Sequence, residues 1–188
     1  MNMDFFPELQ LTLFNGWFLF IWYVIIIGII TIIVPKEVRT RLFDRANFTK
    51  SQKIITVIEK SLALVFLILI FLTPLAYGSL DFIVGLIIFI LGMIGIIIAT
   101  YDFAKTPLDE PVTRRLYKIS RHPQETMIAV ILLGVSIAIG SLFAVLFHIF
   151  LRILTHFRLV AEEQACLQQY GESYQEYLDR VPRYFLFF

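Results

Sequence analysis

The sequence predicts an all-α, polytopic membrane protein with about five transmembrane helices. Three observations predict this class. The chain of 188 residues is 59% hydrophobic, and its mean hydropathy of +0.80 exceeds the range of soluble globular domains. Apolar stretches of about 20 residues recur, the length that a helix needs to cross a bilayer. The polar connectors between them are rich in lysine and arginine, so we expect a single integral membrane domain over residues 1–188.

The N-terminal part, residues 1–101, is expected to hold three spans. Their apolar stretches are residues 14–34, 57–77 and 82–101. A basic connector over residues 36–60 separates the first two, and a tight turn at residues 78–81 separates the last two. Small residues in a membrane helix permit close packing against a neighbour. The third stretch has three of them, at Gly85, Gly92 and Gly95.

The C-terminal part, residues 102–188, begins with a second polar connector over residues 102–124. The apolar stretch 126–157 that follows would be about 48 Å long as one helix, more than a bilayer needs, yet it is short for two full spans. We therefore expect a helical hairpin with short or tilted arms that turns near Gly140-Ser141. Helix should continue to about Tyr170, where Gly171 is a suitable C-cap.

The distribution of basic residues predicts the orientation. Both long connectors and the tail are rich in lysine and arginine, whereas residues 1–10 and the turn at 78–81 have none. The positive-inside rule places the connectors and the C-terminus in the cytosol and the N-terminus outside. The host membrane would be the cell membrane in a prokaryote or the endoplasmic reticulum in a eukaryote.

Two polar clusters flank the expected hairpin. Arg121-His122-Pro123 precedes it, and Arg158 with Glu162-Glu163 follows it. Charges at the edge of lipid cost several kcal/mol unless they have partners or a task, so we expect the clusters to form one site. Simpler roles stay open, because Arg158 and Glu162 have the spacing of a helical salt bridge and Pro123 suits the start of a helix. No metal site is expected, because no cysteine or aspartate joins the histidines of the last span.

The two clusters sit within a longer pattern. It starts at Pro111-Val112-Thr113, includes Arg121-His122-Pro123 and Arg158-x-x-x-Glu162-Glu163, and ends with Gly171-x-x-Tyr174-x-x-Tyr177. Over residues 109–183 this pattern resembles the integral membrane methyltransferase superfamily of isoprenylcysteine carboxyl methyltransferases and phospholipid N-methyltransferases. The sequence departs from the family at Glu125, where the family has tyrosine, and at Arg115, where it has glycine.

The resemblance implies S-adenosylmethionine as the cofactor, held in a cytosolic pocket. It implies that Glu162 binds the cofactor and that Arg158 faces the methyl acceptor, which makes these two the expected catalytic residues. A carboxylate accepts hydrogen bonds from ammonium or ribose hydroxyls, and Arg121 or His122 would donate to the cofactor carboxylate. The expected cofactor-binding residues are Val112, Tyr117, Arg121, His122, Pro123, Glu125, Glu162 and Glu163.

The expected function is methyl transfer from S-adenosylmethionine to a lipophilic acceptor that enters from the bilayer. An isoprenylcysteine-type carboxylate ranks first and a phospholipid amine next. For an amine, Glu125 or Glu163 is the nearest proton acceptor. The alternatives are a nicotinamide-dependent reductase of the sterol reductase type and a non-catalytic membrane scaffold. The expected partners are a lipophilic or lipidated substrate and membrane lipid, without nucleic acid or metal; the oligomeric state stays open.

Overall fold

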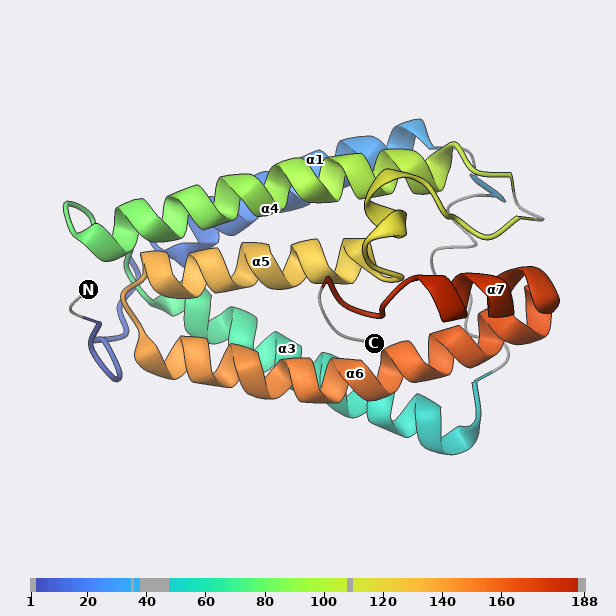
Figure 1. Cartoon of the computed structure of the whole chain (residues 1–188). Helices are drawn as coiled ribbons and strands as arrows, with labels where there is room; N and C mark the ends of the chain where they lie inside the picture. Colours follow the sequence, from blue (N-terminus) through green and yellow to red (C-terminus); the bar gives the residue numbers. More distant parts are fainter. Residues whose placement is uncertain (1–2, 35, 38–47, 108–109, 186–188) are drawn as a thin grey trace.

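The computed structural model describes residues 3–34, 36–37, 48–107 and 110–185. Within this part the chain is helical and forms no strands. Figure 1 shows an elongated bundle with the long helices side by side. The elements are α1 (Gly16–Ile33), α3 (Lys50–Leu72), α4 (Leu80–Ala104), the 3-10 helix η1 (Arg115–Lys118), α5 (Pro123–Ala138), α6 (Leu142–Tyr170) and α7 (Glu172–Arg180).

The helices confirm an all-α, multi-pass membrane protein. Four of them, α1, α3, α4 and α6, are long and apolar enough to cross a membrane. The apolar helix α5 has 16 residues and forms the short arm of the hairpin. Four long helices and one short one agree with the prediction of about five spans.

The second span begins earlier than expected, at Lys50 rather than near residue 57. A capping box explains the difference, because the Thr49 side chain accepts from the backbone N–H of Gln52 while the Gln52 side chain accepts from the N–H of Thr49. The helix also ends earlier, at Leu72, just before Pro74. Glu59, which we expected in the polar connector, is therefore buried inside a helix.

The hairpin is found where the sequence predicts it. Helix α5 ends at Ala138, Gly140 has a positive φ of 65°, and the Ser141 side chain caps α6 by accepting from the N–H of Ala144. At the other end of α6, Gly171 has a φ of 58° and is the C-cap.

Helices α4 and α5 form the most extensive packing in the described part of the chain. Glycines make this contact possible. A Cβ atom added to Gly134 would lie 2.6 Å from the backbone nitrogen of Phe89, and one on Gly92 would lie 2.9 Å from that of Ile131. Only hydrogen fits at such positions, so the two backbones pack directly, as the glycines of the third span predict.

The two ends of the bundle collect different segments. One end holds the N-terminal segment and both tight turns, where the N–H of Leu142 donates to the carbonyl of Asp4 at 2.9 Å. The opposite end collects η1, the start of α5, the end of α6 and α7 (Figure 1). The two polar clusters therefore lie at the same end. Which side of the membrane this end faces stays a prediction, and Arg39, Arg41 and Arg45, on which it partly depends, are outside the described residues.

Candidate functional site

The loop before α5 is fixed by the C-terminal segment. The N–H of Arg121 donates to the carbonyl of Pro182 at 3.0 Å, and the Ser120 hydroxyl donates to the carbonyl of Arg183 at 2.8 Å. His122 is the N-cap of α5, and Pro123 occupies its first turn, where a missing N–H is tolerated. The cluster before the hairpin is thus held in place by residues that follow α7.

Glu163 is the centre of the first half of the site. Its carboxylate accepts from Arg121 NH1 at 3.3 Å and lies 3.0 Å from His122 Nε2. Arg183 donates to the same carboxylate from Nε at 2.9 Å and from NH2 at 2.7 Å. The Glu163 side chain is only 7% exposed. Both of its oxygens are engaged, so Glu163 holds these donors together.

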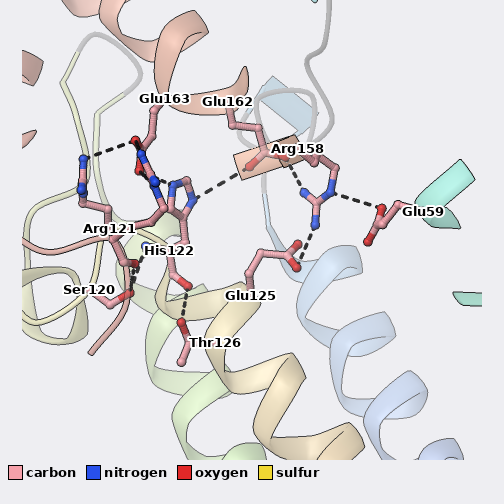
Figure 2. Close-up of polar contacts among 10 residues, drawn as sticks. Glu59, Ser120, Arg121, His122, Glu125, Thr126, Arg158, Glu162 and Glu163 are labelled. Carbon is pink, nitrogen blue, oxygen red and sulfur yellow. Dashed lines mark hydrogen bonds and ion pairs between the residues drawn. The ribbon is translucent and has the colours of Figure 1, made fainter. Parts of the chain in front are cut away.

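Arg158 is the centre of the second half, and three carboxylates from three helices surround it (Figure 2). Its NH1 lies 2.5 Å from Glu162 on α6, its NH2 lies 2.9 Å from Glu125 on α5, and its Nε lies 3.4 Å from Glu59 on α3. The Arg158 side chain is 2% exposed. A guanidinium at this depth requires such anions, because charge is strongly disfavoured near hydrocarbon.

His122 connects the two halves. Its Nδ1 lies 4.0 Å from Glu162 Oε2, while its Nε2 faces Glu163 (Figure 2). The clusters on either side of the hairpin therefore form one polar network, as predicted. The helical salt bridge between Arg158 and Glu162 exists, but it is one part of this larger arrangement.

The predicted site residues fall into two groups. Six of them share the polar network: Arg121, His122, Glu125, Arg158, Glu162 and Glu163. Val112 and Tyr117 are buried in an apolar cluster with Ala99. The Tyr177 hydroxyl donates to the carbonyl of Tyr117 at 2.7 Å, and burial raises the pKa of Tyr177. Pro123 is fully buried at the start of α5.

Two members of the network were missed by the sequence prediction. Glu59 was assigned to the connector, although following the helix back to the Thr49 capping box would have placed it inside α3. The Thr155 hydroxyl donates to Glu59 Oε1 at 3.1 Å, which completes the partners of that carboxylate. Arg183 was noted as part of the tail without a role, and no local signal in the sequence indicates that it reaches Glu163.

Two carboxylates of the second half reach its accessible side. Glu59 is buried and forms ion pairs with both Arg158 and Lys60; the Lys60 Nζ lies 3.5 Å from Glu59 Oε2. The Glu125 and Glu162 side chains are 25% and 29% exposed, and both form ion pairs with the Arg158 guanidinium. Such an arrangement favours a cationic ligand near these two carboxylates. Among the described residues, no group of three or more His, Cys, Asp or Glu side chains is placed to hold a metal ion.

Comparison with known protein families gives a match to this chain. The family described as phospholipid methyltransferase matches residues 75–173, more than half of the chain. The matched segment covers the hairpin and both predicted clusters, whereas Glu59 and Arg183 lie outside it. No curated protein and no solved structure gives a significant match.

Proposed function

The chain belongs to the phospholipid methyltransferase family, and from this premise we propose that it transfers a methyl group from S-adenosylmethionine to the amine of a membrane phospholipid. Membership makes it a membrane methyltransferase that acts on lipid. The observation that carries the finer proposal is the pair of partly exposed carboxylates, Glu125 and Glu162, on the buried Arg158.

The residues present suit the proposed cofactor. S-adenosylmethionine supplies an electrophilic methyl group on a sulfonium and also carries an ammonium, a carboxylate and ribose hydroxyls. Glu162 is accessible enough to accept from the ammonium or the hydroxyls. Arg121 Nη1 and His122 Nε2 already face Glu163, whereas Arg121 Nε is buried without a hydrogen-bond partner in the described part of the chain, so Arg121 Nε is the donor left for a carboxylate.

The charge of the site favours an amine over a carboxylate as the acceptor. The sequence ranked an isoprenylcysteine-type carboxylate first, with Arg158 as its anchor. In the structure each of the three Arg158 nitrogens already faces a carboxylate, of Glu59, Glu125 or Glu162, so Arg158 is not free to anchor an anionic acceptor. A lipid ammonium instead complements these carboxylates, which moves the phospholipid amine to first place.

An amine acceptor must lose a proton, and Glu125 is placed to take it. A protonated amine has no free lone pair to accept a methyl group, so the lipid ammonium must first give its proton to a base. Glu163 is unsuited, because both oxygens are engaged by Arg121, His122 and Arg183. Glu125 is held by one contact to Arg158 and is partly exposed, so it retains an oxygen for the acceptor. Arg158 positions Glu125 and Glu162 relative to each other.

The test uses the full chain in nanodiscs that contain phosphatidylethanolamine, with S-adenosylmethionine labelled on its methyl group. We expect the label in the lipid for the wild type and none in a farnesylated cysteine peptide. Glu162→Ala and His122→Ala should abolish cofactor binding in a calorimetric titration. Glu125→Gln should bind the cofactor normally and lose at least about 100-fold in methyl transfer.

A matched control is Glu176→Gln, which removes an exposed carboxylate on α7 and should leave both readouts unchanged. Unchanged cofactor affinity in both the Glu162 and His122 variants contradicts the proposed site. Stabilisation by a nicotinamide cofactor in a thermal-shift assay, with none by S-adenosylmethionine, contradicts the proposed reaction, because a bound ligand stabilises the folded state.

A further inference from the structure

A second guanidinium lies deeper in the apolar part of α6. Arg152 has a buried Nε without a hydrogen-bond partner. Within the described residues no carboxylate oxygen lies within the 4.0 Å limit of an ion pair with it, in contrast to Arg158 with its three acids. A cation among apolar side chains is costly unless an anion compensates it. Arg152 therefore has no direct ion-pair partner in the described part of the chain, which leaves its guanidinium for an anionic ligand.

Arg152 borders the proposed acceptor site. The groups close enough to interact with it electrostatically are Glu125, Glu59, Arg158 and Tyr184. One helical turn beyond it on α6, His156 Nδ1 lies 3.0 Å from the Tyr184 hydroxyl. Positive charge at Arg152 thus lies near Glu125, without a direct ion pair between the two.

The surroundings of Arg152 favour a ligand that arrives from the bilayer. Ile149 lies three residues before Arg152 on the same part of the α6 surface and is large, apolar and exposed, as a side chain is where a helix faces lipid. An inorganic anion would have to leave water and cross this apolar surface, which is strongly disfavoured. A phosphate carried on a lipid reaches the same depth with its chains already in the hydrocarbon.

We propose that Arg152 binds the phosphate of the lipid acceptor while Glu125 binds its ammonium. This inference rests on the proposed function and assigns its headgroup specificity. A guanidinium binds phosphate through two parallel N–H···O contacts, which fixes both distance and orientation. Opposite charges side by side in the site match a zwitterionic headgroup, in which phosphate and ammonium are joined by a short linker.

The test compares two acceptors, phosphatidylethanolamine and octadecylamine, which has a primary amine but no phosphate. For Arg152→Gln we expect KM for phosphatidylethanolamine to rise about 10- to 100-fold, the effect of losing charge-assisted hydrogen bonds. KM for octadecylamine should stay within about twofold. Arg152→Lys, which keeps the charge without the paired contacts, should fall between the wild type and Arg152→Gln. The control Arg180→Gln removes an exposed arginine on α7 and should change neither KM.

Two further measurements separate this role from a structural one. The thermal midpoint of Arg152→Gln without lipid should match that of the wild type, because Arg152 makes no ion pair in the described part of the chain that the substitution would remove. Affinity for S-adenosylmethionine should also be unchanged. A lower midpoint with equal rises in KM for both acceptors overturns the proposal in favour of a packing role. Weaker cofactor binding with unchanged lipid KM assigns Arg152 to the cofactor carboxylate and also overturns it.

Lipid binding is measured separately from turnover, with fluorescent phosphatidylethanolamine and a fluorescent long-chain amine titrated into the detergent-solubilised chain. Loss of the phosphatidylethanolamine signal alone in Arg152→Gln supports the proposal even without turnover. A wild type that binds the lipid but methylates neither acceptor contradicts the proposed function and leaves the assignment of Arg152 standing. Equal binding of phosphatidylethanolamine by the wild type and Arg152→Gln overturns the assignment.

Discussion

Glu163 offers the sharpest test of the polar network. Glu163→Gln keeps the shape of the side chain and removes its charge. Arg121, which is buried, and Arg183, which is mostly buried, then face a neutral amide. Gln also replaces one carboxylate oxygen with an NH₂ group, which is a donor. Arg121 and Arg183 donate to this position, so the new NH₂ group would face their N–H groups and find no acceptor there.

The structure sets the size of the effect. Removal of one partner from a buried ion pair costs about 3–5 kcal/mol, because the remaining charge stays buried and uncompensated. Arg183 retains some solvent contact, so we expect about 3 kcal/mol of lost unfolding free energy. The Arg183 contacts are bidentate, at 2.9 and 2.7 Å. We therefore expect a coupling free energy of about 1.5–3 kcal/mol between Glu163→Gln and Arg183→Gln in a double-mutant cycle.

The assay is reversible unfolding in mixed micelles, with the free energy of unfolding extrapolated for the wild type, both single variants and the double variant. The pair Glu176 and Arg180 on α7 is the matched control. Its atoms are 3.8 Å apart and its side chains are 74% and 72% exposed, so Glu176→Gln should change stability by no more than a few tenths of a kcal/mol. Additive effects at Glu163 and Arg183, or a Glu163 effect no larger than that at Glu176, would refute a structural role for this network.

Two other predictions follow from the packing around the site. Glu59→Gln keeps an oxygen that can accept from Thr155 but removes the negative charge 3.4 Å from Arg158 Nε. We therefore expect kcat, measured by radiolabel transfer, to fall about 10-fold, while cofactor affinity, measured by calorimetry, stays within about twofold. Gly134→Leu should lower the thermal midpoint by several degrees or prevent folding, because its Cβ would lie 2.6 Å from the Phe89 nitrogen. Gly28→Leu is the control, since nothing lies within 4 Å of its added Cβ, and a midpoint as low as that of Gly134→Leu would contradict the packing argument.

Much of the fold follows from local sequence. Each long apolar stretch became a helix, because in lipid the backbone must satisfy its own hydrogen bonds. The turn at Gly140-Ser141 and the end of α6 at Gly171 needed only the chemistry of single residues, a positive φ and a capping side chain. The one clear error, the start of α3, came from overlooking the capping box at Thr49 and Gln52, a local signal that was present in the sequence.

The site likewise has features that follow from the sequence and features that only the tertiary structure determines. Which charges need partners was apparent from the sequence, since Arg121, His122, Arg158, Glu162 and Glu163 border apolar stretches. Which partners they find was decided by the tertiary structure. Glu59 reaches Arg158 because α3 packs against α6, and Arg183 reaches Glu163 because the segment after α7 folds back on the loop before α5. An ion pair depends on how helices are rotated and spaced, to within a few ångströms, and that is set by packing between elements distant in the chain rather than by the pattern within any one of them.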